Sequence, residues 1–175
     1  RNRMNRFDMS EYSGYDAIMR LTGPDGLLTS AVRREPFSVL LFDEIEKANP
    51  VFHNLLLQIL EEGRLTDSRG RLVNFCSTVI IMTSNIGAAA LKRRRIGITV
   101  GSPQDDLADH YKRAVEKAFP PELVNRFEDI IPFHSLDAAS IRQVVDREMA
   151  LLTRREGIRY RRMSLHVDHS VLEYL

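Results

Sequence analysis

The stretch Pro36-Phe37-Ser38-Val39-Leu40-Leu41-Phe42-Asp43-Glu44 is a short apolar run that ends in two adjacent carboxylates. An uninterrupted apolar run of this length predicts a β-strand buried on both faces of a parallel sheet, with helices before and after it. A second run of the same kind, Thr78-Val79-Ile80-Ile81-Met82, ends in Thr83-Ser84-Asn85. Since ligands gather at the carboxyl ends of parallel strands, we expect both polar endings at one edge of the sheet.

Further elements are predicted on both sides of these strands. Asn49 as N-cap, Pro50 in the first turn and Gly63 as a left-handed C-terminal cap predict a helix over residues 51–62. Alternation and helical spacing predict the remaining elements, which are a strand within 1–9, a hairpin over 63–73, a helix over 107–118, a strand over 129–133, a long helix over 141–152, a strand over 163–167 and the start of a helix over 168–175. Residues 87–104 are expected to form a loop.

The composition is that of an ordinary globular domain. The chain has 175 residues, 43% of them apolar, and its 25 Lys and Arg nearly balance its 24 Asp and Glu, so neither a disordered segment nor a broad cationic surface for nucleic acid is expected. The single cysteine, Cys76, excludes a disulfide framework and is predicted to be a buried small residue. No apolar run is long enough to cross a bilayer, and a reducing, cytoplasmic location is the expectation.

The polar endings of the two strands suggest phosphate chemistry. An acidic residue directly after a buried strand, Asp43, can hold Mg²⁺ through its water shell, and the adjacent Glu44 can orient or deprotonate an attacking water. Asn85 on the neighbouring strand can fix that water or a terminal phosphate. An alternative stays open at this point, in which Asp43 and Glu44 only begin a loop that Glu46 and Lys47 continue as solvated residues.

Six motifs are spread over almost the whole chain. They are Phe7-Asp8-Met9-Ser10-Glu11-Tyr12, Ala31-Val32-Arg33-Arg34-Glu35-Pro36, Asp43-Glu44-Ile45-Glu46-Lys47-Ala48, Gly63-Arg64-Leu65-Thr66-Asp67, Val79-Ile80-Ile81-Met82-Thr83-Ser84-Asn85 and Pro121-Glu122-Leu123-Val124-Asn125-Arg126. These motifs resemble the second nucleotide-binding domain of Clp-type AAA+ proteins, a family of unfoldases and disaggregases. They occur in the family's order and at plausible spacings, which makes the resemblance far more specific than any one motif.

The resemblance implies the fold and its division. The expected class is α/β, an AAA+ P-loop NTPase-like three-layer sandwich with a mostly parallel sheet, followed by the start of a small C-terminal α+β subdomain. Residues 1–134 would be a partial large subdomain without its first strand and phosphate loop, and residues 135–175 would begin the small subdomain.

The resemblance also assigns roles to four positions. Asp43 and Glu44 match the Walker B pair, with Asp43 organising Mg²⁺ through water and Glu44 activating the attacking water. Asn85 matches the sensor of the terminal phosphate of ATP. Arg126 matches the arginine finger, which in this family reaches the nucleotide of the neighbouring subunit, whereas the sequence alone would favour an ion pair with Glu128 or Asp129.

Partners follow from the same resemblance. It implies a homohexameric ring that hydrolyses ATP to remodel or unfold protein substrates, with a peptidase partner left open and no role for a membrane or nucleic acid. A degenerate AAA+ module kept for assembly or regulation is the alternative. A nucleic-acid-binding relative that uses the basic loop Lys92-Arg93-Arg94-Arg95 is a third hypothesis. His166 and His169 do not predict a metal site, since no further ligand converges on them.

Two departures from the family pattern qualify these expectations. The sequence contains no Gly-x-x-x-x-Gly-Lys-Ser/Thr run, and both ends look cut, so we expect a fragment that does not bind ATP normally by itself. The family's Gly-rich pore loop with its exposed aromatic residue is replaced by residues 23–28, which contain no aromatic residue. The nearby Tyr15 is expected to pack rather than to replace that aromatic.

Overall fold

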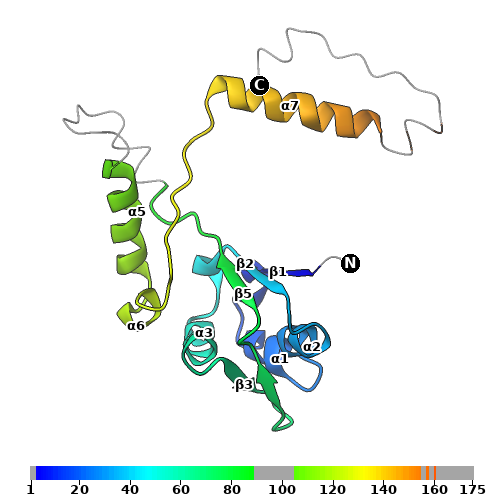
Figure 1. The fold of residues 1–175 in the computed structure, drawn as a ribbon, viewed down its shortest axis with the longest axis vertical. Helices are drawn as coiled ribbons and strands as arrows, with labels where there is room; N and C mark the ends of the chain where they lie inside the picture. Colours follow the sequence, from blue (N-terminus) through cyan, green and yellow to red (C-terminus); the bar gives the residue numbers. More distant parts are fainter. Residues whose placement is uncertain (1–2, 89–104, 155–156, 158–159, 161–175) are drawn as a thin grey trace. The chain divides into compact units, whose positions relative to one another are not determined.

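The computed structural model describes residues 3–88, 105–154, 157 and 160, and the chain divides into two compact units, Arg1–Pro132 and Phe133–Leu175. Figure 1 shows the helices and strands of each unit. The first unit contains β1 (Met4–Asp8), the 3-10 turn η1 (Met9–Tyr12), α1 (Ala17–Thr22), α2 (Leu27–Arg34), β2 (Val39–Asp43), the 3-10 turn η2 (Ile45–Lys47), α3 (Pro50–Glu62), β3 (Arg64–Thr66), β4 (Leu72–Asn74), β5 (Val79–Met82), α5 (Asp105–Ala118) and α6 (Pro121–Val124). The second contains α7 (Ala138–Thr153).

The main sheet of the described residues has three parallel strands in the order β1-β2-β5. The register pairs Phe7 with Phe42 and Phe42 with Met82, and it also pairs Asp8 with Asp43. All three strands therefore end at the same edge, as the sequence predicts. This edge, formed by Asp8, Asp43 and the residues that follow each strand, is called the carboxyl edge below.

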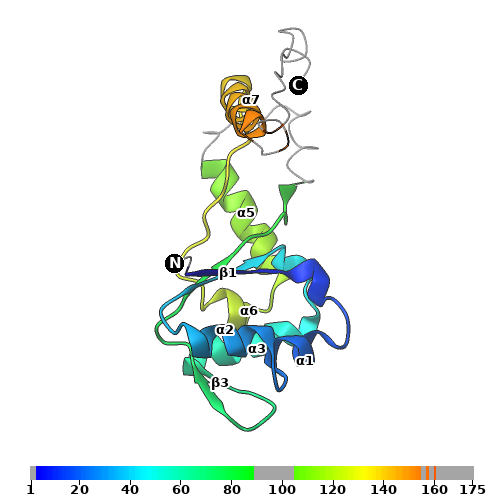
Figure 2. The ribbon, with the colours of Figure 1, turned by 90° about the vertical axis from the view of Figure 1, so that its right-hand side faces the viewer.

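One face of the sheet is covered by helices α1, α2 and α3, which lie together beneath it in Figure 2. Leu40 and Phe42 of β2 are fully buried against them. Phe42 stacks on Phe7 with ring centroids 5.6 Å apart and meets Phe52 of α3 edge-on at 5.2 Å. Aromatic contacts of this kind add to the free energy gained from burial, so this face holds the sheet in a fixed position relative to the helices.

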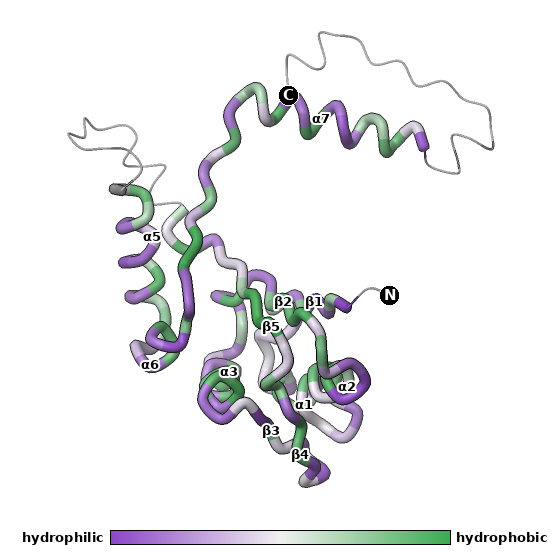
Figure 3. The backbone as a smooth tube through the Cα atoms, in the orientation of Figure 1, coloured by the Kyte–Doolittle hydropathy of each residue, from purple (hydrophilic) through white to green (hydrophobic). Residues whose placement is uncertain are grey.

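The opposite face of the sheet corrects the prediction of strands buried on both faces. Val39 and Leu41 of β2 are only half-buried, and Val79 and Ile81 of β5 remain 58% and 47% exposed. The apolar stretch is visible on β5 and β2 in Figure 3. The reason is that among the described residues no element covers these side chains as α1–α3 cover the other face.

Helix α3 forms where its capping residues predict it. The Asn49 side chain accepts a hydrogen bond from the Val51 amide, Pro50 occupies the first turn, and Gly63 ends the helix with φ 64°. The predicted hairpin is present as the antiparallel pair of β3 and β4. Because Gly63 leads straight into β3, the cap turns the chain from the helix into the hairpin.

A buried carboxylate attaches this hairpin to the helices. Asp67 is 3% exposed and accepts hydrogen bonds from the Arg71 side chain at 2.8 Å and from the amides of Arg69 and Arg71. Arg33 of α2 lies 3.5 Å from the same carboxylate, and Arg71 also donates to the Pro24 carbonyl. Burial alone would raise the pKa of Asp67, but the hydrogen bonds from Arg71 and the two amides outweigh it and lower the pKa to about 2.

Acid should therefore weaken the fold through Asp67. The folded chain binds a proton at this carboxylate less readily than the unfolded chain, whose ordinary pKa is 3.8, so its stabilising contribution is complete above that value and is lost as the pH falls toward about 2. Urea unfolding at about pH 7 and about pH 3 measures this loss. Asp67→Asn should lower the melting temperature by several degrees at neutral pH and should flatten the pH dependence in that window. An unchanged pH dependence in the variant would contradict the assignment.

The last part of the first unit packs on α3. Phe119, at the end of α5, and Leu123 of α6 are buried, and Phe119 meets His53 of α3 edge-on with ring centroids 5.4 Å apart. Burial lowers the pKa of His53. The predicted helix over 107–118 is confirmed as α5, whereas the predicted strand over 129–133 is wrong. This stretch is irregular and pairs with none of the described strands.

Two predictions about single residues are also wrong. Cys76 is exposed, since it lies in the turn between β4 and β5, where its amide donates to the Asn74 side chain. Tyr15 is fully exposed and does not pack, because it stands in the turn that precedes α1. The predicted loop after residue 88, the basic residues Lys92–Arg95, and the elements predicted over 163–175 lie outside the described residues.

In the second unit the described residues form mainly one helix, α7. The helix confirms the prediction over 141–152, and the Asp137 side chain caps it by accepting a hydrogen bond from the Ser140 amide. Hydrogen bonds from the Ser140 side chain and then from its amide lower the pKa of Asp137. The division into residues 1–134 and 135–175 stays a prediction. Within the part of the chain that the structure describes, no helix has both the length and the apolar character needed to cross a membrane.

Candidate functional site

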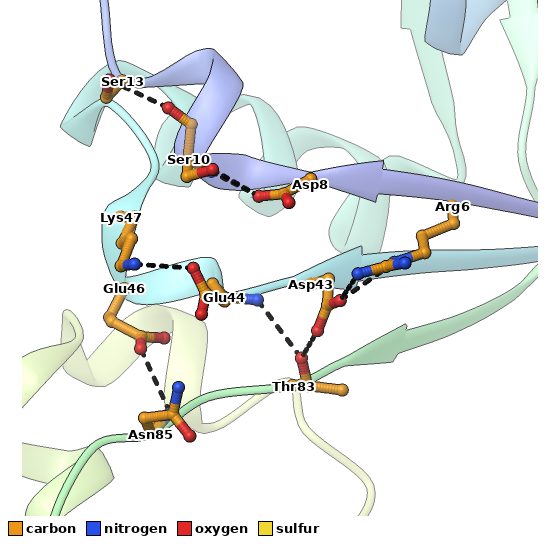
Figure 4. Close-up of polar contacts among 10 residues, drawn as sticks. All are labelled: Arg6, Asp8, Ser10, Ser13, Asp43, Glu44, Glu46, Lys47, Thr83 and Asn85. Carbon is orange, nitrogen blue, oxygen red and sulfur yellow. Dashed lines mark hydrogen bonds and ion pairs between the residues drawn. The ribbon is translucent and has the colours of Figure 1, made fainter. Parts of the chain in front are cut away.

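The carboxyl edge brings together three of the four predicted site residues. Asp43 ends β2, Glu44 follows it, and Asn85 lies just past the end of β5. Figure 4 shows them with the side chains that hold them, which come from β1, from η2 and from the segment after β5. In the structure each of the two carboxylates has a specific partner, which is Arg6 with Thr83 for Asp43 and Lys47 for Glu44.

Asp43 is held from both neighbouring strands. The Arg6 guanidinium of β1 donates to its Oδ2 from Nε at 2.9 Å and also from Nη2, while the Thr83 hydroxyl donates to Oδ1. The hydrogen bond from Thr83, followed by that from Arg6, lowers the pKa of Asp43 below its ordinary value. The carboxylate is therefore ionised at neutral pH and fixed in orientation, with about a quarter of its side chain exposed.

Glu44 has a strained backbone. Its φ of 55° and ψ of 51° make it the only non-glycine residue with positive φ among the described residues. A left-handed glutamate is unfavourable, and such strain is retained where a site needs it. The Glu44 amide donates to the Thr83 hydroxyl at 3.2 Å, and the Ile45 amide donates to the Thr83 carbonyl at 3.0 Å. These two hydrogen bonds fix the turn that directs Glu44.

The Glu44 side chain pairs with a lysine of the same turn. Lys47 Nζ lies 2.7 Å from Glu44 Oε2, and this hydrogen bond raises the pKa of Lys47. The carboxylate of Glu44 thus has one oxygen bound to a cation, and about a third of its side chain is exposed at the edge. A carboxylate in this state can accept a proton or a hydrogen bond from a water molecule through its other oxygen.

Asn85 is fixed through its backbone. Its amide donates to Glu46 Oε1 at 3.1 Å, which ties the segment after β5 to the turn after β2. The second carboxylate oxygen of Glu46, Oε2, is buried and has no hydrogen-bond partner. The Asn85 side chain itself is exposed. The edge thus presents one amide and several carboxylate oxygens, which is the hard oxygen chemistry that Mg²⁺ prefers.

Arg126 does not lie at the carboxyl edge of its own chain. It follows α6, and its Nη2 donates to Glu61 Oε1 of α3 at 2.7 Å. Both side chains are nearly half exposed, so this ion pair adds little to the stability of the fold. The alternative partners suggested by the sequence, Glu128 and Asp129, are not the ones the structure shows.

Several residues that build the edge escaped the sequence analysis. Four further side chains bind the predicted site residues, and the sequence assigns none of them this part: Arg6, Lys47, Thr83 and Glu46. For Arg6 a signal existed, since Arg6 and Asp8 lie two residues apart in an alternating strand and therefore share a face. What the sequence could not supply was the register that pairs Asp8 with Asp43.

The fold and the edge together define the class of protein. Residues 1–130 match the family described as AAA domain (Cdc48 subfamily), so the chain belongs to that family. Its relatives place it further, among the Clp-type AAA+ ATPases. It is 46% identical to the chaperone protein ClpB of Oceanobacillus iheyensis and 45% identical to ClpC/MecB of Bacillus subtilis, a negative regulator of genetic competence, over 165 residues and 87% of the chain in each case.

A solved structure supports the same placement. The fold is similar to that of Hsp104, reconstructed by electron cryo-microscopy in a closed state with ATPγS and FITC-casein, with a TM-score of 0.73 and 34% identity over 88% of this chain. The predicted α/β fold is confirmed. The chain spans 20% of the length of the two curated relatives and 28% of the Hsp104 chain.

Proposed function

We propose that this chain supplies part of an ATP-hydrolysing site in a ring-forming protein unfoldase. Its residues hold the metal ion and orient the attacking water. The observation that carries the proposal is the carboxyl edge, where Asp43, the strained Glu44 and Asn85 meet on adjacent parallel strands. Family membership supports it, because the relatives include the chaperone protein ClpB of Oceanobacillus iheyensis.

The residues at this edge fit Mg²⁺. Among the described residues no group of three or more His, Cys, Asp or Glu side chains could hold a metal ion directly, so the fit is to an ion held through water by Asp43. The Asp43 carboxylate already attracts a cation, the Arg6 guanidinium. Asp43 would hold the ion through its water shell, and the ion would neutralise charge on the phosphates of ATP. Gripping those phosphates needs a glycine-rich loop with a lysine, and the 175 residues contain no such motif.

Glu44 and Asn85 have separate parts in this mechanism. The free carboxylate oxygen of Glu44 orients an attacking water and accepts its proton, while Lys47 holds the carboxylate in one orientation. The Asn85 side chain donates to the terminal phosphate, and Glu46 sets its position through the Asn85 amide. Each group is fixed before the reaction, which is how a site lowers a barrier without reorganising.

Arg126 acts outside its own site. Its pairing with Glu61 of α3, rather than with a residue of the carboxyl edge, supports a role on the nucleotide of a neighbouring subunit in a homohexameric ring. Protein chains are the proposed substrate and the cytoplasm is the proposed location, and a peptidase partner of the ring stays open.

A specific observation favours a second candidate, an AAA+ module that assembles or regulates without pulling substrate. The connection from α1 to α2 has only the residues Gly23 to Gly26, and a Cβ on Gly26 would lie 2.4 Å from the Leu21 carbonyl oxygen. So close a turn has no room for a projecting loop, and it carries no aromatic residue that could grip a peptide.

Unfolding of a fluorescent folded protein by the intact protein separates the two candidates. With ATP and Mg²⁺ the unfoldase should abolish the fluorescence of a tagged reporter, and Asp43→Asn should reduce that rate to background because the metal loses its carboxylate. Arg113→Gln on α5, an exposed residue paired with Asp109, is the matched control. ATP-dependent ring assembly without unfolding would select the regulatory module, and failure of both would reject the proposed function.

A further inference from the structure

A polar row crosses all three strands at the carboxyl edge. Arg6 of β1 lies two residues before Asp8, the register partner of Asp43, so Arg6 and Asp43 are diagonal neighbours on one face of the sheet. Thr83 follows β5 on the other side of Asp43. Figure 4 shows the guanidinium on one oxygen of the carboxylate and the hydroxyl on the other. Both oxygens of the proposed metal-holding residue are therefore engaged by the protein itself.

We propose that Arg6 is a positioning residue that acts as a built-in counter-cation of Asp43 and weakens the binding of divalent cations there. The inference rests on the proposed role of Asp43 in holding Mg²⁺. Arg6 orients the carboxylate for the water shell of the ion, but its positive charge opposes the arriving ion and occupies Oδ2. The metal should consequently bind reversibly at this edge rather than remain there.

The other charges at the edge do not relieve this competition. Asp8 accepts hydrogen bonds from the Ser10 amide at 3.1 Å and from its hydroxyl at 2.6 Å, and Glu44 is bound by Lys47. Asp43 on β2 differs from these two carboxylates, because its cationic partner, Arg6, lies on the neighbouring strand β1. The Arg6 side chain is 62% exposed, so the guanidinium can turn away from Asp43 into solvent. Withdrawal of Arg6 would open Oδ2 to water bound by the metal.

A purely structural role for Arg6 is the competing explanation. The β1–β2 pair has its own ladder and the Phe7–Phe42 ring contact beneath it. An exposed ion pair adds little to such an interface. Loss of the Arg6 side chain should therefore leave the sheet intact, and its main effect should appear in cation binding.

The test uses Mn²⁺ alone as the probe on the ¹⁵N-labelled 175-residue chain. Paramagnetic broadening of the amide signals of Asp43, Glu44 and Thr83 reports binding at the edge without any need for ATP turnover. Arg6→Gln should lower the half-saturating Mn²⁺ concentration by about fivefold, because a unit charge close to the site no longer opposes the ion. Raised salt should shrink that difference, and Arg6→Lys should restore the weaker binding.

Controls separate this inference from the proposed function. Arg3→Gln removes an arginine at the other end of β1, whose partner is Glu35, and should not change Mn²⁺ binding. Equal or weaker binding in Arg6→Gln overturns the inference, as does absence of broadening in both the parent chain and this variant. If Asp43→Asn abolishes broadening while Arg6→Gln leaves it unchanged, the inference alone fails. If Asp43→Asn leaves broadening intact, the metal assignment in the proposed function fails with it.

Discussion

Glu44→Gln in the intact protein is expected to lower kcat for ATP hydrolysis by about 10²- to 10⁴-fold, the usual contribution of a positioned general base. Glutamine keeps the size of the side chain and the left-handed backbone of residue 44, but it cannot accept the proton of the attacking water. Nucleotide affinity should be retained, because Asp43 and its partners Arg6 and Thr83 are untouched. Steady-state hydrolysis and equilibrium binding of a fluorescent ATP analogue measure the two quantities.

The control for this prediction lies at the opposite edge of the sheet. Glu35→Gln changes an acidic residue that follows α2 and pairs with Arg3 at 3.8 Å, so it removes a similar charge without touching the carboxyl edge. It should leave kcat unchanged. Equal losses in Glu35→Gln and Glu44→Gln would mean that the effect comes from the fold, and retained kcat in Glu44→Gln would show that another group activates the water.

Much of the fold can be predicted from local sequence signals, namely helix-capping residues and apolar runs. Asn49, Pro50 and Gly63 fix both ends of α3, and the glycine appears in the left-handed conformation that its place requires. The apolar run ending at Asp43 and the run ending before Thr83 become adjacent parallel strands. These predictions succeed because caps and buried strands depend on residues close in sequence.

The errors arise where a distant neighbour decides the outcome. Residues 129–133 have the composition of a strand, but a strand needs a partner with free hydrogen-bonding groups. Cys76 is apolar enough for a core, yet the turn between β4 and β5 leaves it in solvent. Val79 and Ile81 look like residues buried on two sides, and their exposure depends on what covers the sheet.

In the candidate site, too, the features set by nearby residues could be predicted and those set by distant neighbours could not. Asp43, Glu44 and Asn85 could be placed at one edge because parallel strands end together. Their supporting side chains could not, since Arg6 reaches Asp43 only through a diagonal set by the register, and Lys47 reaches Glu44 only because the chain turns sharply at Glu44. The sequence does not predict the strained backbone of Glu44, because glutamate is not a residue type that favours positive φ.

Arg126→Ala in the intact protein is expected to reduce ATP hydrolysis by about 10³- to 10⁵-fold, the range found when a guanidinium is removed from a transferring phosphoryl group. The variant should keep its fold, because the ion pair with Glu61 is half exposed and contributes at most about 1 kcal/mol to stability. Glu61→Gln is the matched control, since it breaks the same ion pair but leaves the guanidinium. It should retain most of the activity.

Mixing two inactive variants then shows on which subunit Arg126 acts. A subunit with Arg126→Ala has an intact Glu44, and a subunit with Glu44→Gln has an intact Arg126. If the finger reaches a neighbour, a mixed ring contains interfaces where both groups are present, so the mixture should hydrolyse ATP although neither variant does so alone. If Arg126 served its own site, every site in the mixture would lack one group and no activity would return. Recovery is therefore the result expected from a chain whose Arg126 pairs with α3 rather than with its own carboxyl edge.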